Sequence, residues 1–272
     1  VSTGAYHPTD SGVAFGGAGN DIIHGSYGID HLYGDAGDDQ IRGYDGIDYL
    51  SGNDGNDLLE GGNGYDMLWG GAGNDVIYGE SAFNGPVSTV GEADYIYGED
   101  GNDEIYGGGG GDGLSGDAGD DYIHGGAGND SVNGGEGNDT LLGGDGDDSI
   151  TGGAGADRLT GGAGRDTFVL THADGIGYST DVITDFMRNP PVNGGDIVDM
   201  RFLFNNYTDF SGTTAEQAAQ QGYLRFVQIG SAGQSGYGTM IYIDPNGSAP
   251  DTNPYYHDLP AAFLEGVGVG GG

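Results

Sequence analysis

Apolar residues recur at every ninth position between residues 16 and 169, and each follows an aspartate by two positions. The unit reads G-G-x-G-x-D-x-U-x, where U is apolar, as in residues 16–24 and 134–142. After a glycine turn, three residues of extended chain place U on one side of the backbone and its neighbours on the other. The pattern therefore predicts a short strand in each unit and a core made of the eighth positions.

Sixteen copies of this unit follow one another, with an insertion in the eighth copy at about residues 80–93. Self-similarity at a fixed short spacing is typical of a solenoid, whose core forms by stacking. Two units make one coil of strand, turn, parallel strand and turn, and coils stack at roughly 4.8 Å. We therefore predict an all-β fold, a parallel β-roll (β-solenoid) of about eight coils, with the two-strand alternation kept in phase across the insertion.

Apart from the apolar residue, the positions of the unit that recur from copy to copy are the sixth-position aspartate and the turn glycines. Aspartate occupies the sixth position in every copy: Asp21, Asp30, Asp39, Asp48, Asp57, Asp66, Asp75, Asp94, Asp103, Asp112, Asp121, Asp130, Asp139, Asp148, Asp157 and Asp166. Glycine adopts left-handed backbone conformations at no steric cost and leaves its carbonyl oxygen uncovered. The glycines that we select as candidate carbonyl donors are Gly17, Gly19, Gly37, Gly55, Gly73, Gly126, Gly128, Gly135, Gly137, Gly144, Gly146, Gly153 and Gly155.

Regularly spaced carboxylates beside uncovered carbonyl groups suit calcium, which takes six to eight oxygens at roughly 2.3–2.6 Å. One turn cannot supply them, but two turns stacked on the same edge can. We therefore predict that each ion binds aspartates eighteen residues apart, such as Asp21 and Asp39, together with glycine carbonyl oxygens. The chain would hold roughly ten or more Ca²⁺ ions. Such sites exist only in stacked coils, so we expect the chain to be disordered without calcium.

The G-G-x-G-x-D-x-U-x pattern resembles that of the RTX (repeats-in-toxin) proteins, over more than half of the chain. The resemblance implies a parallel β-roll with calcium in its turns and export by a type I secretion apparatus. The insertion lengthens one turn, and we expect it to replace or distort one metal site. Its residues 83–87 form either a surface excursion or a partner-binding loop.

Composition narrows the possible partners of the chain. The formal net charge is −37, and the six cationic side chains are all arginines. Nucleic acid is excluded as a partner, because phosphate binding needs basic patches. The absence of cysteine excludes disulfides and zinc–thiolate sites. With no apolar run of membrane-spanning length, we expect no membrane insertion, and a monomer that is secreted or on the bacterial cell surface.

The two edges of the predicted roll differ at the fifth position of the unit. Odd-numbered copies carry mostly Asn or Asp there, whereas the first even-numbered copies carry Ile29, Ile47 and Tyr65, near Tyr27 and Tyr44. Outward strand positions add Tyr49, Met67, Trp69, Tyr95 and Tyr97 on one face and Leu58, Val76, Tyr78, Tyr106 and Tyr122 on the other. These residues either stabilise the sheets by stacking or dock an upstream domain or a carbohydrate-like ligand. An ice-binding surface is disfavoured, because it would need rows of Thr and Asn.

Outside the repeats we expect a lead-in at residues 1–15 and a C-terminal α+β region at 170–272. Its predicted strands lie at 181–186, 196–200, 223–227, 239–243 and 261–267, and its predicted helix lies at 213–221. This region would cap the open end of the roll, which otherwise exposes unpaired strands. The order of its motifs resembles the type I secretion target region of RTX adhesins and exoproteins, which implies a secretion signal near residues 266–272.

The sequence offers no catalytic motif, since neither H-E-x-x-H nor G-x-S-x-G occurs. His24, His31 and His124 fall at outward positions of the unit. We therefore expect no enzymatic activity. The chain starts at Val1 without methionine, so we interpret it as a piece of a longer polypeptide with further domains upstream. Two hypotheses remain: the C-terminal part of a large bacterial adhesin, or the non-catalytic tail of an RTX exoenzyme (a protease, lipase or alginate-modifying enzyme).

Overall fold

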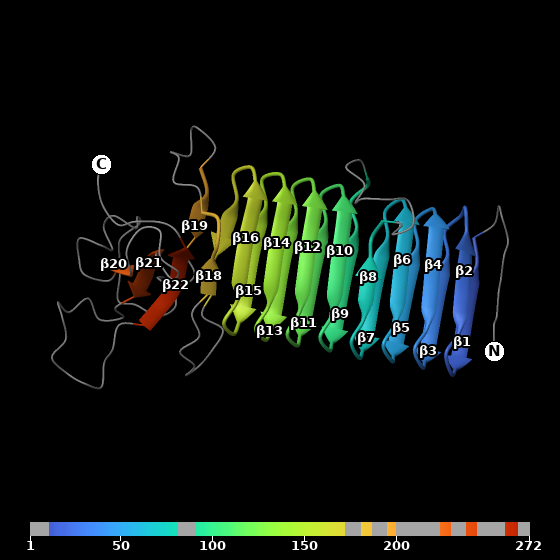
Figure 1. The fold of residues 1–272 in the computed structure, drawn as a ribbon. Coiled ribbons are helices and arrows are strands. Elements are labelled where there is room, and N and C mark those ends of the chain that lie inside the picture. The colour runs from blue at the N-terminus through green and yellow to red at the C-terminus, as the bar shows by residue number, and fades with distance from the viewer. Residues whose placement is uncertain are drawn as a thin grey trace.

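The protein is a two-sheet parallel β-roll along the whole of its repeat region (Figure 1). The computed structural model describes residues 11–80, 91–171, 181–186 and 195–199, and the backbone of strands at 224–229, 238–243 and 259–265. Odd-numbered strands form one sheet and even-numbered strands the other, until the last three strands join the even sheet. The predicted all-β roll of about eight coils is confirmed.

The odd sheet holds ten strands in the order in which they follow along the chain. They are β1 (Val13–Ala18), β3 (His31–Ala36), β5 (Tyr49–Asp54), β7 (Met67–Ala72), β9 (Tyr95–Asp100), β11 (Gly113–Ala118), β13 (Ser131–Glu136), β15 (Ser149–Ala154), β17 (Thr167–Val169) and β19 (Ile197–Asp199). The strand β1 thus begins inside the expected lead-in.

The even sheet holds twelve strands, of which the last four come from the C-terminal region. They are β2 (Ile22–Ser26), β4 (Gln40–Asp45), β6 (Leu58–Asn63), β8 (Val76–Tyr78), β10 (Glu104–Gly109), β12 (Tyr122–Ala127), β14 (Thr140–Asp145), β16 (Arg158–Ala163), β18 (Asp181–Ile183), β22 (Leu259–Glu265), β21 (Gly238–Ile243) and β20 (Leu224–Ile229).

Each strand pairs in parallel with the strand one coil further on, in a register of eighteen residues. Leu32 is opposite Leu50 and Ile41 is opposite Leu59. Across the insertion the register becomes twenty-eight, with Leu68 opposite Ile96, and then returns to eighteen. The insertion therefore does not change the alternation of the two sheets, as predicted.

The core is a double row of eighth-position side chains, one per unit. All are at most 3% exposed: Ile23, Leu32, Ile41, Leu50, Leu59, Leu68, Ile77, Ile96, Ile105, Leu114, Ile123, Val132, Leu141, Ile150, Leu159 and Phe168. Most strands are six residues long, not three, because the chain stays extended through the first three positions of the following unit. The glycine-rich segment is therefore half strand and half turn.

Both sheets extend past residue 169, where the sequence analysis ended the roll. The strand β18 pairs with β16, and β19 pairs with β17, all in parallel. Next to β18 lies β22, also parallel, followed by β21 and β20 in antiparallel order. The C-terminal strands thus continue the even sheet at the end opposite the N-terminus (Figure 1). The predicted helix at 213–221 and most of the inserted loop lie outside the described residues.

Candidate metal centre

Every repeat aspartate lies at a turn with its carboxylate turned into the roll, and each is at most 3% exposed. One carboxylate oxygen, Oδ1, accepts the backbone N–H of the aspartate one coil earlier on the same edge. The N–H of Asp21 donates to Oδ1 of Asp39 at 2.7 Å, and that of Asp30 donates to Oδ1 of Asp48 at 2.8 Å. We call these two series the aspartate ladders, one on each edge of the roll.

The first ladder follows the turns from odd to even strands, at the bottom of Figure 1: Asp21, Asp39, Asp57, Asp75, Asp103, Asp121, Asp139 and Asp157. The second ladder follows the turns at the top: Asp30, Asp48, Asp66, Asp94, Asp112, Asp130, Asp148 and Asp166. The pairing of aspartates eighteen residues apart along each edge is as predicted. The step from Asp66 to Asp94 passes the insertion at the ordinary 2.8 Å, so the expected distortion does not affect the ladder there.

The second carboxylate oxygen, Oδ2, is buried without any hydrogen-bond donor in thirteen of these residues: Asp39, Asp48, Asp57, Asp66, Asp75, Asp94, Asp103, Asp112, Asp121, Asp130, Asp139, Asp148 and Asp166. Burying an ionised carboxylate without a partner costs several kcal/mol per group. A domain has a net stability of only about 5–15 kcal/mol. At neutral pH the roll therefore needs a cation, or protons, to compensate these oxygens.

A glycine at the first position of each unit makes room for the carboxylate. A Cβ atom added at Gly16 would lie 3.0 Å from Oδ2 of Asp21 and 2.6 Å from the carbonyl oxygen of Gly34 in the next coil. The same two kinds of oxygen crowd the added carbon at Gly98, where Gly116 supplies the carbonyl group at 2.8 Å. The packing therefore explains why every copy starts with glycine, and it brings carboxylate and main-chain oxygens close together.

The predicted carbonyl donors all adopt the left-handed backbone that glycine favours, although Asp35, Tyr44 and Asn53 adopt it at equivalent second positions. Each of the thirteen selected glycines has a positive φ, from 97° at Gly17 to 147° at Gly146. At several of them an added Cβ would meet a carbonyl oxygen of the preceding coil, as at Gly37, 2.7 Å from the oxygen of Gly19. The carbonyl oxygens of the turns thus point along the stack. Their role as calcium ligands remains a prediction.

In the described part of the chain, no three His, Asp or Glu side chains lie close enough together to hold a metal ion by themselves. Any cation held between two carboxylates of a ladder must therefore complete its ligand shell with main-chain oxygens or water. The repeat predicts such a shell, in which each pair of aspartates shares an ion with glycine carbonyl groups. The donor set, made only of oxygens, suits a hard cation such as Ca²⁺.

Burial raises the pKa of Asp48, Asp66, Asp94 and Asp112 in the second ladder, and neighbouring carboxylates add to the effect. The pKa of Asp48 and of Asp112 is raised to about 7, although a backbone N–H opposes the shift at each. Beside the insertion, burial and the charges of Glu80 and Glu92 raise the pKa of Asp66 to about 7. The largest value is that of Asp94, about 9. Desolvation is therefore the main cause of these shifts, and repulsion between carboxylates is a smaller one.

The fifth-position Asn and Asp residues form a further row of hydrogen bonds. From the sequence, only a difference between the two edges at this position was apparent. On the first edge the N–H of Asn74 donates to Oδ1 of Asn56 at 2.7 Å, and the N–H of Asn102 donates to Oδ1 of Asn74 at 2.8 Å. Each side chain thus binds the turn of the following coil. On the second edge Ile29, Ile47 and Tyr65 have no such acceptor to offer.

We call the apolar residues near the fifth positions of the second edge the apolar stripe. They are exposed, as predicted: Tyr27, Ile29, Tyr44, Ile47 and Tyr65 are between 39% and 62% accessible. The outward aromatic residues stack along the coils, as in the pairs Trp69–Tyr97 and Tyr78–Tyr106, whose ring centroids lie 6.2 and 5.0 Å apart. Stacking therefore accounts for these aromatic residues on the strands, whereas the ring of Tyr44 in the stripe stacks on His24, which lies outside the stripe.

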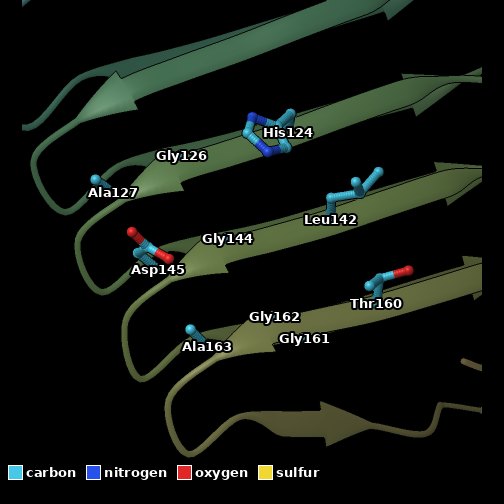
Figure 2. A pocket seen from close by; sticks show the side chains of 10 residues that line it. All are labelled: His124, Gly126, Ala127, Leu142, Gly144, Asp145, Thr160, Gly161, Gly162 and Ala163. Atoms are coloured by element: carbon cyan, nitrogen blue, oxygen red, sulfur yellow. The ribbon is translucent and has the colours of Figure 1, made fainter. Parts of the chain in front are cut away.

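A shallow groove of about 400 Å³ crosses the outer face of β12, β14 and β16. Figure 2 shows His124, Leu142 and Thr160 projecting from successive strands over a floor of glycines. The hydroxyl of Thr160 is engaged with that of Thr184 at 2.9 Å, and burial lowers the pKa of His124. The groove is a consequence of small residues beside a row of larger ones.

Two ladder members were missed by the sequence analysis, which assigned them only to strands. The N–H of Asp157 donates to Oδ1 of Asp181, and that of Asp166 donates to Oδ1 of Asp196. A signal existed, because both residues precede an apolar residue by two positions, as in the repeat. The irregular spacing and the incomplete glycine pattern, with Gly177 before Asp181 and Gly194 before Asp196, concealed it.

A parallel roll whose turns carry stacked, buried carboxylates and open glycine carbonyls is the architecture of a calcium-binding repeat protein. The model of the RTX calcium-binding nonapeptide repeat matches residues 15–50, 51–84, 91–114, 112–141 and 133–168. The chain belongs to this family, and its repeats are calcium-binding repeats. No curated protein matches the chain. Among the described residues, no helix has the length and apolar character of a membrane span.

Proposed function

We propose that this chain is a calcium-dependent folding and secretion module, the C-terminal part of a large bacterial adhesin. Its ladder aspartates and turn glycines would hold Ca²⁺ between adjacent coils, and its C-terminal region would carry the type I secretion signal. The proposal rests on one observation, the two rows of buried Oδ2 atoms that have no hydrogen-bond donor. Proteins with these repeats are typically secreted by type I systems, which supports the export step.

The physical basis of the proposal is the balance between self-repulsion and stacking. In a calcium-poor cytosol the ladder carboxylates repel one another, and the chain stays unfolded and able to pass through an export channel. Outside the cell, calcium supplies the positive charge that lets two coils stack. The chain's own residues do the rest: the eighth-position side chains form the core, and the backbone N–H groups orient each carboxylate through Oδ1.

A calcium titration of the full chain, followed by far-UV circular dichroism, tests the folding step. We expect little β-structure in chelator and a cooperative gain when calcium is added, since metal binding and folding are one process. Magnesium is the matched control, because it keeps its waters and a stricter geometry, and it should be much less effective. A substantial β signal in chelator at neutral pH would contradict the proposal.

The secretion step is tested by export. The chain is fused behind a passenger domain and expressed with a type I apparatus, and the exported fraction is compared with that of a fusion lacking residues 170–272. Loss of export on truncation is the expected result. To separate the adhesin from the exoenzyme tail, cells that express the parent protein are assayed for calcium-dependent attachment and their medium for hydrolytic activity. Hydrolysis without attachment would favour the exoenzyme.

A further inference from the structure

The two aspartate ladders do not end with the repeats. The N–H of Asp157 donates to Oδ1 of Asp181 at 3.2 Å, and the N–H of Asp166 donates to Oδ1 of Asp196 at 3.1 Å. Both carboxylates are only 8% exposed. They follow their predecessors by twenty-four and thirty residues, whereas the repeat step is eighteen, and the family match ends at residue 168.

The segments that follow these two aspartates behave like repeat units without glycines. Ile183 lies two positions after Asp181, is fully buried, and pairs with the core residue Leu159. Val198 lies two positions after Asp196 and pairs with Phe168. The strands β18 and β19 therefore build one more coil, in which longer connections replace the nine-residue units and D-x-U is retained in both strands.

The last repeat aspartate, Asp166, directly precedes this coil in the second ladder. Asp166 is fully buried, and its Oδ2 has no hydrogen-bond donor, like the corresponding oxygens inside the repeats. The pair Asp166 and Asp196 thus repeats the N–H to Oδ1 bond of an interior ladder step, and the Oδ2 of Asp166 requires the same compensation as the corresponding oxygens inside the repeats. An interior step, from Asp130 to Asp148, has the same bond at 2.8 Å.

We propose that Asp181 and Asp196 are calcium ligands, so that both rows of ions continue one coil beyond the repeats and bind the C-terminal strands to the roll. Asp181 would share an ion with Asp157, and Asp196 would share one with Asp166. This inference rests on the proposed role of the ladder aspartates as calcium ligands. Because β18 pairs with β22, with Asp181 opposite Ala262, calcium at this coil also stabilises the sheet formed by β22, β21 and β20.

The test uses the full chain with the variants Asp181→Asn and Asp196→Asn. Asparagine keeps an acceptor for the backbone N–H but places an NH₂ group, a donor, where a cation needs an oxygen. Calcium stoichiometry is measured by isothermal titration calorimetry, and hydrogen exchange is followed in β18, β19 and β22. We expect each variant to bind one ion fewer, with faster exchange in these strands while the interior strands stay protected.

Two further variants make the result interpretable. Asp145→Asn changes the same charge at an exposed position outside both ladders and should leave stoichiometry and exchange unchanged. Asp121→Asn alters an interior ladder step and should lose calcium if the ladders bind it at all. Calcium loss in Asp121→Asn but not in the Asp181 and Asp196 variants would overturn this inference alone. Unchanged calcium binding in all of them would overturn the proposed function as well.

Discussion

At the scale of single residues, the two oxygens of the repeat aspartate have different tasks. In Asp130, Oδ1 accepts the backbone N–H of Asp112 and fixes the geometry of the turn, while Oδ2 is buried without a donor. The first oxygen therefore belongs to the fold, and the second is available to a cation. This division explains why aspartate occupies every copy of the sixth position, where asparagine would supply only the first of these two functions.

Replacing Asp130 by alanine should weaken two neighbouring calcium sites, since this side chain lies between Asp112 and Asp148. It also leaves the buried N–H of Asp112 without its acceptor, at a cost of about 1–3 kcal/mol. We expect lower calcium stoichiometry by calorimetry and a lower unfolding midpoint. The exposed Asp145→Ala is the control, and an unchanged stoichiometry in Asp130→Ala would count against the ligand assignment.

The first-position glycine is a second residue whose role is set by space. An alanine at Gly116 would press its Cβ against the carboxylate of Asp121 and come within 2.7 Å of the carbonyl oxygen of Gly134. We expect Gly116→Ala to destabilise the calcium-loaded roll by about 1–3 kcal/mol, as overpacking does. In the control Gly113→Ala the added carbon meets the ring of the exposed Tyr95 at 2.9 Å and lies in ordinary contact, 3.9 Å, with the carbonyl oxygen of Asp94. Thermal unfolding at fixed calcium distinguishes the two, and equal stability would refute the steric explanation.

At the scale of elements, the nine-residue period specified which side chains form the core and which strands pair. Ile41 and Leu59 are buried opposite each other because a two-unit coil admits no other register. The coil made by β18 and β19 was not predicted, because steps of twenty-four and thirty residues break the period and the full G-G-x-G pattern does not precede Asp181 or Asp196. Strand length was also underestimated, since backbone pairing, which side-chain pattern does not reveal, extends the strands through the glycines.

The fifth-position row illustrates how an element gains stability from a periodic side chain. Asn56 accepts the N–H of Asn74, whereas Ile47 on the other edge offers no acceptor to the following turn. Ile47→Asn should therefore raise the free energy of unfolding by about 0.5–1.5 kcal/mol, and Asn56→Ile should lower it by a similar amount. Denaturant titration in saturating calcium measures both. Opposite signs would mean that the apolar stripe, and not the Asn row, is the stabilising feature.

At the scale of the whole molecule, charge decides when the roll is stable. Burial raises the pKa of Asp48 and Asp112 to about 7 and that of Asp94 to about 9. In the unfolded chain these carboxyl groups titrate near pH 4, at about their ordinary value. Because the folded pKa lies above the unfolded one, protonation favours the fold. In metal-free protein this contribution is fully present below about pH 4 and is lost as the pH rises through about 7.

We therefore expect pH to act in opposite directions with and without calcium. In chelator, lowering the pH from about 8 to about 5 should increase β-structure, because protons neutralise the buried carboxylates. In limiting calcium the same change should release the metal, because protons compete for the ligand oxygens. Circular dichroism and a calcium-sensitive dye, read at matched ionic strength, measure the two effects. A fall of β-structure on acidification in chelator would show that the carboxylates are not desolvated as described.

The eighteen-residue register has a consequence for how such a chain can change its length. A single nonapeptide forms half a coil, so its removal would transfer every later strand to the other sheet and exchange the polar and apolar rims from that point onward. Removal or duplication of two adjacent units restores each strand to its own side. The repeat region can therefore gain or lose nonapeptide units only in even numbers. Internal duplications retained during evolution should be multiples of one two-unit coil.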